Sequence, residues 1–304
     1  MTKRIKRVKP LNPRARWFEL FGVVLVVSVV AFIIAITSSA AIERLDSKTL
    51  QVWFLDVGQG DATLIITPEG KKILIDAGPD NTILAKLGAI LPPWDRTLDA
   101  IVVTHPDADH VTGFVELLDR YEVNEIITSG TDAFTPVVDA FDEALDLEGV
   151  EVRLVKAGDM IEFGDVIFET VWPLTVLDGI FPENRNNTSV TFKVIYGETT
   201  ILLTGDAEEE AERGFASSVG DVDVYKVGHH GSITSTTNNL LEQISPEYAV
   251  VSAGFENRHG HPHPIVVDRL KSIDAEIFRT DLQGDILLSS TGDEPTLTPH
   301  PLIY

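Results

Sequence analysis

Residues 104–110 read Thr104-His105-Pro106-Asp107-Ala108-Asp109-His110. This stretch follows an apolar run rich in β-branched residues at Ala100–Thr104 and precedes a run with helical spacing at Val111–Tyr121. Four candidate metal ligands therefore stand at a strand end. Alternating positions in such a turn can aim His105 and Asp107 at one point and Asp109 and His110 at a neighbouring one, as two metal ions about 3.5–4 Å apart require. A turn that only caps the helix would need one carboxylate, Asp107 or Asp109.

Three further polar loops follow predicted strands. Thr204-Gly205-Asp206 closes one strand, although Asp206 could instead cap the helix expected at Ala207–Ala216. Lys226-Val227-Gly228-His229-His230-Gly231-Ser232 closes another strand, and Arg258-His259-Gly260-His261-Pro262-His263-Pro264 precedes a helix. Seven of the eight histidines lie in three of these four loops, which favours a common site.

The remaining pattern indicates a layered α/β or α+β domain. Short apolar runs separated by Gly, Pro and Asp predict many strands with interspersed helices between residues 48 and 290, without a low-complexity linker. We expect further helices at Pro136–Leu145 and Pro264–Ile273. The tail of residues 291–304 is rich in turn residues and has no recognisable motif; His300 within it is expected to be solvated.

Composition limits the chemistry. The chain contains no cysteine, so any metal must be held by imidazole and carboxylate. The net charge is −23, but residues 1–19 carry seven Lys/Arg and one Glu, which leaves −29 on the rest of the chain. Such an acidic body repels nucleic acid at long range, because nucleic-acid binding depends on clustered Lys and Arg.

The amino-terminal residues predict a membrane anchor. Residues 20–42 contain no ionisable side chain and are long enough to span a bilayer as a helix. The basic segment of residues 1–19 predicts a cytoplasmic amino terminus and an extracytoplasmic domain, in a single-pass protein of the cell membrane. Ser38-Ser39-Ala40 also fits a cleaved signal peptide, but the apolar run is longer than usual for one.

The motifs HPDADH, TGD and HHGS, in this order, resemble the metallo-β-lactamase superfamily. FLDVGQGDA at 54–62, IDAG at 75–78 and GHPHP at 260–264 are similar to the extracytoplasmic domain of ComEC-type DNA-uptake proteins. The resemblance covers residues 48–290 and implies a four-layer αββα sandwich with two metals at one edge, between the sheets.

The resemblance also implies roles for individual residues. We expect His105 and Asp107 at one metal, Asp109, His110 and His229 at the other, and Asp206 as the bridge, with a metal-bridging hydroxide as the nucleophile. The motif does not decide between His229 and His230, although His229 is favoured. Asp109 and His263 are the catalytic candidates; His263 would protonate the leaving group or bind phosphate, unless it only holds a turn. The substrate-binding candidates are His230, Ser232, Asn186, Asn187 and Arg258, whereas Asp56, Asp61 and Asp76 are expected to support ligands or turns.

Two departures from the superfamily pattern affect the choice of metal. Asp107 replaces the usual second histidine, and Asn184–Ser189, where a third-motif histidine is expected, has none. An oxygen-rich site favours harder ions such as Mn²⁺ or Mg²⁺ over Zn²⁺. We therefore expect two divalent ions, Mn²⁺ or Zn²⁺, and not a true β-lactamase.

Three functions follow from this reading. The first is a membrane-anchored phosphodiesterase or nuclease, with DNA as a candidate substrate and a separate channel protein as partner, because the chain itself has only one apolar span. The second is a small-molecule esterase acting on choline-phosphate or a lactone, which needs no basic groove. The third is an inactive anchored binding module.

Overall fold

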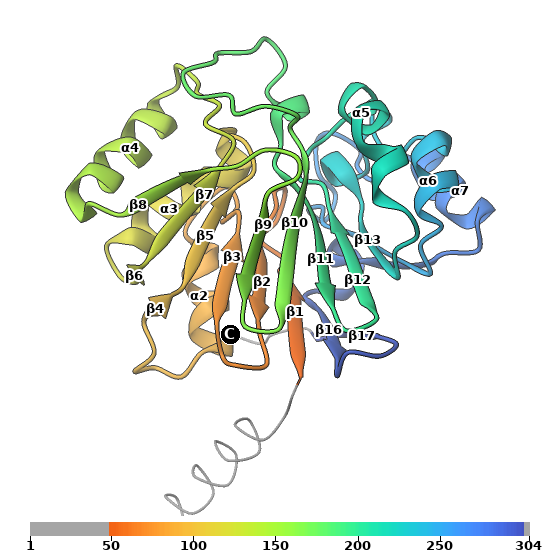
Figure 1. Ribbon diagram of the computed structural model, residues 1–304, viewed down its shortest axis with the longest axis horizontal. Coiled ribbons are helices and arrows are strands. Elements are labelled where there is room, and N and C mark those ends of the chain that lie inside the picture. The colour runs from red at the N-terminus through yellow and green to blue at the C-terminus, as the bar shows by residue number, and fades with distance from the viewer. Residues whose placement is uncertain (1–48, 301–304) are drawn as a thin grey trace, which may run out of the picture. The chain divides into compact units, whose positions relative to one another are not determined.

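The computed structural model describes residues 49–300, apart from the side chains of residues 146–148. Two β-sheets face one another, and helices cover the outer face of each (Figure 1). This arrangement confirms the predicted sandwich. The expected anchor at residues 20–42 lies outside the described residues, and within residues 49–300 no helix has the length and apolar character needed to cross a bilayer.

The first sheet has eight strands in the order β17-β16-β1-β2-β3-β5-β7-β8. Its β3, β5, β7 and β8 run parallel to one another, and the other neighbours are antiparallel. The strands are β1 Leu50–Phe54, β2 Thr63–Ile66, β3 Lys72–Ile75, β5 Ala100–Val103, β7 Glu125–Thr128, β8 Glu151–Leu154, β16 Ile286–Ser290 and β17 Thr296–Pro299. A separate pair joins β4 Thr97–Leu98 to β6 Glu122–Val123.

The second sheet has seven strands in the order β15-β14-β13-β12-β11-β10-β9. Its β12, β13, β14 and β15 are parallel, so their carboxyl ends share one edge. The strands are β9 Met160–Phe163, β10 Val166–Trp172, β11 Thr191–Tyr196, β12 Thr199–Leu203, β13 Val224–Lys226, β14 Tyr248–Val251 and β15 Glu276–Arg279.

The helices lie on the outer faces of the sheets. Those over the first sheet are α2 Thr82–Ile90, α3 Ala108–Leu118 and α4 Pro136–Glu148. Those over the second sheet are α5 Glu209–Val219, α6 Asn238–Ile244 and α7 Pro264–Ser272. Short helical turns complete the set: η1 Asn186–Thr188, η2 Gly228–Gly231 and α8 Thr280–Gln283.

Three apolar clusters hold the four layers together. Along β1, Val52 and Phe54 pack in the cluster between the sheets, whereas Trp53 packs in the cluster under α2, α3 and α4. Successive side chains of a strand point to opposite faces, so a strand buried on both faces reads as a continuous apolar run. A third cluster packs the second sheet against α5, α6 and α7.

Two details differ from the sequence prediction. Helix α5 begins at Glu209 after Glu208, so Asp206 is not its cap. The first sheet continues into the expected tail, because β17 pairs with β16. His300 is exposed, as expected, although its ring centroid lies 4.9 Å from that of Trp53 in an edge-on contact. β17 is short and mostly exposed, and it therefore lacks the buried apolar pattern by which strands are recognised.

Candidate metal centre

The HPDADH loop leaves β5 and enters α3 at the edge between the two sheets. His105 and His110 are buried, whereas the side chain of Asp109 is 37% exposed. Asp107 occupies the N-cap position of α3 by its backbone, but its side chain makes no capping hydrogen bond. The carboxylates of this loop are therefore not consumed in capping the helix.

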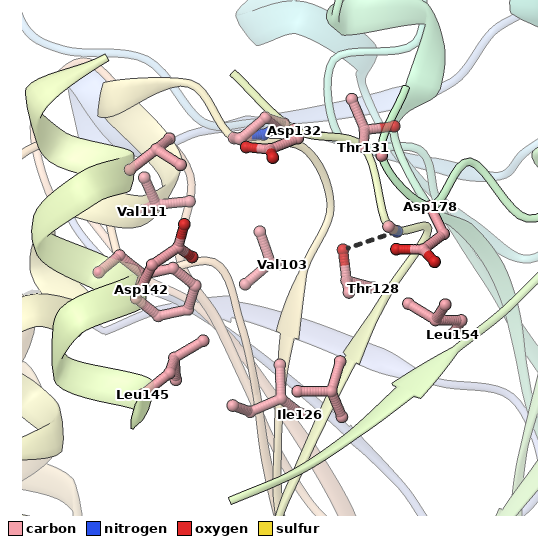
Figure 2. Close-up of a pocket in the computed structure, with 16 residues that line it drawn as sticks. Val103, Val111, Ile126, Thr128, Thr131, Asp132, Asp142, Leu145, Leu154 and Asp178 are labelled. Carbon is pink, nitrogen blue, oxygen red and sulfur yellow. Dashed lines mark hydrogen bonds between the residues drawn. The ribbon is translucent and has the colours of Figure 1, made fainter. Parts of the chain in front are cut away.

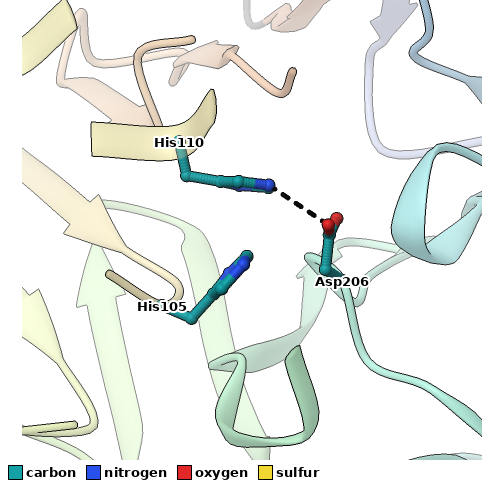
Figure 3. Close-up of side chains that lie close together, drawn as sticks. All are labelled: His105, His110 and Asp206. Atoms are coloured by element: carbon teal, nitrogen blue, oxygen red, sulfur yellow. Dashed lines mark ion pairs between the residues drawn. The ribbon is translucent and has the colours of Figure 1, made fainter. Parts of the chain in front are cut away.

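Asp206, which follows β12, meets the histidines of this loop. His110 Nε2 lies 3.3 Å from Asp206 Oδ2, and the rings of His105 and His110 have centroids 4.1 Å apart. Figure 3 shows the two imidazoles directed toward the carboxylate. One ligand atom from each of the three residues lies within 4.8 Å of the others, which is close enough for a shared cation.

His230, which follows β13, enters the same space. Its Nε2 lies 3.4 Å from Asp109 Oδ2 and 3.4 Å from Asp206 Oδ2. Asp109, His110 and His230 form a second group of potential ligands, also within 4.8 Å of one another. The two groups adjoin through His110, and Asp206 contacts residues of both.

Four candidate metal-ligand atoms of this cluster have no hydrogen-bond partner. The Nε2 atoms of His105, His110 and His230 and the Oδ1 atom of Asp206 are buried and make no hydrogen bond within the described part of the chain. Buried polar atoms are nearly always satisfied, so a cluster of exceptions calls for a ligand. Imidazole and carboxylate are suitable ligands for a divalent transition metal, and the residues present therefore fit one.

Hydrogen bonds on the opposite ring nitrogens orient these histidines. His110 Nδ1 lies 2.7 Å from Asp76 Oδ2, His105 Nδ1 lies 3.1 Å from Thr104 Oγ1, and His230 Nδ1 lies 3.1 Å from the Ser252 carbonyl. A partner at Nδ1 directs the lone pair of Nε2 toward the ion, as metal-binding histidines require.

A buried ion pair between Asp61 and Lys226 contacts the Nδ1 side of the His230 ring. Asp61 Oδ1 lies 3.2 Å from His230 Nδ1, and Lys226 Nζ donates to Asp61 Oδ2 at 2.8 Å. The sequence prediction gave Asp61 and Asp76 a supporting place but did not single out Lys226. A charged residue at the end of the otherwise apolar strand β13 is the signal that would have identified it.

The geometry distinguishes the two adjacent histidines. His229 remains 23% exposed and directs Nδ1 to Glu208 at 3.0 Å, with Nε2 3.7 Å from Asp206. His230 is buried within the cluster. Both have left-handed backbones, with φ of 46° and 54°, so the two rings leave the turn in different directions. His230, and not the expected His229, thus belongs to the described groups of candidate ligands whose atoms lie within 4.8 Å of one another.

Asp107 faces two partners. Its Oδ2 atom lies 3.9 Å from His105 Nε2, and its Oδ1 atom accepts a hydrogen bond from Arg185 Nε. In the segment without a histidine, Ser189 Oγ lies 3.3 Å from His105 Nδ1 and accepts from the backbone N–H of Asp206. Residues 184–189 thus contribute a guanidinium and a hydroxyl at this place.

The other predicted substrate-binding residues divide into two sets. Asn186 Nδ2 lies 3.3 Å from His229 Nδ1, at the rim of the cluster. Asn187 Oδ1 accepts from Glu208 N, and Ser232 Oγ lies 2.8 Å from Thr234 Oγ1, so both side chains have structural partners. Arg258 donates to its neighbour His259 on the surface, and no described contact joins it to the cluster.

In the last loop, His261 rather than His263 faces the cluster. His263 caps α7, with Nδ1 accepting from Ile265 N at 3.3 Å. The ring centroid of His261 lies 5.7 Å from that of His229 and 6.4 Å from that of His230. Burial, together with the neighbouring imidazoles, lowers the pKa of His261 to about 4, so this ring is neutral at pH 7.

The carboxylates and imidazoles of the cluster shift one another's pKa values. Burial lowers the pKa of His230, but Asp206 and Asp61 outweigh burial and raise that pKa to about 10. Burial also lowers the pKa of His110, but the charges of Asp206 and Asp76 outweigh burial and raise that pKa well above its ordinary value. The reciprocal attraction of these histidines holds the pKa of Asp206 well below its usual range, despite burial.

Comparison with known proteins identifies the family. The family model described as the metallo-beta-lactamase superfamily matches residues 55–254, the range that carries HPDADH, TGD and HHGS. The chain belongs to the metallo-β-lactamase superfamily. As a member, it is a metal-dependent hydrolase, as the motifs indicated. The fold of this superfamily binds divalent metals, which agrees with the unpartnered donor atoms described above.

Its curated relatives include a protein named for the ComE operon and one named for recombination. ComE operon protein 3 of Bacillus subtilis is 30% identical over 83% of this chain and 34% of its own length. Recombination protein 2 of Haemophilus influenzae is 34% identical over 80% of this chain and 29% of its own. This metallo-β-lactamase-fold chain thus spans about a third of the length of these relatives.

Solved structures agree on the fold. The metallo-β-lactamase fold protein YhfI of Bacillus subtilis aligns over 80% of this chain and all of its own, with a TM-score of 0.54 and 12% identity. CmlA of Streptomyces venezuelae, a diiron β-hydroxylase, aligns over 84% of this chain and 54% of its own, with a TM-score of 0.52 and 13% identity. At these identities the likeness concerns the fold alone.

Proposed function

We propose that this metallo-β-lactamase-fold chain hydrolyses phosphodiester bonds with two divalent cations. The observation that carries the proposal is the convergence of His105, His110, His230 and Asp206, whose buried donor atoms lack hydrogen-bond partners. Four such atoms, contributed by loops of both sheets, are more than a structural role requires. An inactive binding module would have no use for this set.

The two ions would be held by adjoining groups of residues. We assign His105 and Asp107 to one ion, and Asp109, His110 and His230 to the other. Asp206 is the bridging candidate, since it lies within 4.8 Å both of His105, assigned to one ion, and of His110 and His230, assigned to the other. When bound, such cations polarise a phosphoryl group and lower the pKa of water from 15.7 to about 7.

Two cationic or proton-accepting side chains complete the proposed site. Arg185 lies beside the HPDADH loop through its contact with Asp107, and a guanidinium matches the geometry of phosphoryl oxygens. His261, neutral at pH 7, is the imidazole of the GHPHP loop that is placed beside the cluster and able to accept a proton. His261 therefore replaces His263 as the proton-transfer candidate, but as a proton acceptor and not as the proton donor to the leaving group that was expected of His263.

For the metal itself we propose Mn²⁺ in preference to Zn²⁺. The group around Asp107 offers one imidazole and otherwise oxygen ligands, because Ser189 and Arg185 stand where a third-motif histidine was expected. Hard oxygen ligands favour the harder ion. Zn²⁺ remains the competing choice at the group that contains two imidazoles, His110 and His230.

We further propose that residues 20–42 anchor the enzyme in the cell membrane, with the hydrolase domain outside. The basic residues of the segment 1–19 support this orientation. The resemblance of FLDVGQGDA, IDAG and GHPHP to ComEC-type DNA-uptake proteins supports a role in DNA uptake, with a separate channel protein as partner. Digestion of residues 49–300 by protease added to intact spheroplasts is expected, whereas protection would mean that the orientation is reversed.

A small-molecule esterase is the second candidate, because the body of the chain is strongly acidic. A metal-by-substrate screen of the full chain in detergent separates the candidates: Mn²⁺ or Zn²⁺ is combined with DNA, RNA, a bis-aryl phosphodiester, a choline-phosphate ester and a lactone. Metal-dependent cleavage of the phosphodiesters supports the first proposal. Cleavage of only the choline-phosphate ester or the lactone supports the esterase, and no turnover with any pair supports the binding module.

A further inference from the structure

A cavity adjoins the loop that carries HPDADH. It has a volume of about 270 Å³ and lies between α4 and the carboxyl ends of β5, β7 and β8 (Figure 2). Pro106, between His105 and Asp107, and Val111, next to His110, form part of its wall. Its volume is close to the lower end of the range of about 300–1,000 Å³ that is typical of small-molecule sites.

The lining of this cavity combines apolar and acidic side chains. Ile126, Leu145 and Leu154 line its lower part in the view of Figure 2, and the carboxylates of Asp132, Asp142 and Asp178 are directed toward the same space. None of the residues that line it is Lys, Arg or His. An anionic ligand would therefore meet only repulsion here, and a cation would find charges of opposite sign.

The loops that carry two of these carboxylates are joined to one another. Asp132 N donates to the Ile180 carbonyl at 3.0 Å, and the exposed rings of Phe134 and Phe181 stack with centroids 4.1 Å apart and planes 2° apart. A Cβ on Gly130 would stand 2.9 Å from the Cα atom of Asp178, so the close approach of the two loops depends on glycine. These contacts hold Asp132 and Asp178 in position without a ligand, which reduces the entropic cost of binding.

We propose that this cavity binds the ammonium-bearing, apolar portion of a small molecule. The hydrocarbon part would lie against Ile126, Leu145 and Leu154, and the ammonium group would lie among the carboxylates. Because the cavity contains none of the proposed metal ligands, this inference holds or fails independently of the proposed hydrolysis. The position beside Pro106 places such a ligand next to the metal loop.

The test uses three probes that share a ring and differ in charge: benzylammonium, benzyl alcohol and benzoate. Each is titrated against the full chain, freed of metal with a chelator, and binding is followed by ligand-observed NMR. We expect benzylammonium to bind most tightly and benzoate most weakly. Equal affinity of the three probes, or no binding of benzylammonium, would overturn the proposal.

Variants locate the binding. Asp132→Asn and Asp178→Asn are each expected to weaken the binding of benzylammonium by about fivefold, as for the loss of one solvent-exposed ion pair. The affinity for benzyl alcohol should not change. Asp139→Asn is the matched control, since Asp139 is an exposed carboxylate of α4 that does not line the cavity. An equal loss in the control would show general attraction to an acidic protein and contradict the proposal.

Discussion

His110 Nδ1 and Asp76 Oδ2 lie 2.7 Å apart in the buried interior, although 34 residues separate them in the chain. Asp76 follows β3 and also accepts hydrogen bonds from the backbone and hydroxyl of Thr104. One carboxylate therefore positions both the start of the HPDADH loop and the histidine that ends it. The neighbouring parallel strands β3 and β5 bring these residues together.

Asp76→Asn is expected to weaken metal binding by about 10- to 100-fold, because the amide no longer carries the charge that raises the basicity of His110. Competition with a fluorescent chelator measures the affinity. Asp80→Asn, at an exposed carboxylate of the following loop, is the control and should bind as the wild type does. Unchanged affinity in Asp76→Asn would mean that the charge of Asp76 does not support His110 as a ligand.

Substitution of His230 and substitution of His229 should have different effects on the amount of bound metal. His230→Ala removes a buried donor of the cluster and is expected to lower the bound metal from two ions per chain to one or fewer, by elemental analysis. His229→Ala removes a partly exposed ring paired with Glu208 and should retain two ions. The reverse result would support His229 as the ligand and contradict the assignment of His230.

Two substitutions separate the choice of metal from loss of the site. Asp107→His supplies an imidazole and should move the preference from Mn²⁺ toward Zn²⁺. Asp206→Ala should abolish activity with both ions, because it removes the bridging candidate. Rates with each metal are the measurement, and circular dichroism checks folding, since buried ligands lose their partners. If the wild type is fastest with Zn²⁺ and Asp107→His leaves that order unchanged, the argument from ligand hardness fails.

The two histidines of the GHPHP loop provide another comparison. His261→Ala should lower kcat and alter the pH profile, since His261 is placed beside the cluster. His263→Ala should instead lower the melting temperature slightly, because it removes the side-chain cap of α7, an effect of about 1 kcal/mol. A loss of kcat confined to His263→Ala would return the proton-transfer role to that residue.

The metal-free protein should become less stable as the pH rises into the alkaline range. A folded-state pKa of about 10 for His230 lies above its ordinary value of 6.5, so the stabilisation is fully present below pH 6.5 and is lost as pH rises toward 10. Urea unfolding at pH 6, 8 and 10 tests this. His230→Gln should show a smaller loss over the same range, and bound metal should reduce the loss in wild type, because the cation replaces the proton. Equal slopes in wild type and His230→Gln would contradict the assignment.

The order of motifs determined the family and the fold class of this chain. Apolar runs that are buried on both faces marked most strands of both sheets, and HPDADH, TGD and HHGS marked three of the loops that meet at one edge. These signals are local, since each depends on residues close together in the chain.

Only the tertiary structure decided which side chains converge. His229 and His230 are neighbours in a turn, and the left-handed backbone at both residues directs His230 inward and His229 toward Glu208. Lys226, Asp61 and His230 form one chain of contacts across the two sheets, with Lys226 and Asp61 separated by 165 residues. No local pattern encodes such a contact, because it arises from the packing of the two sheets against each other.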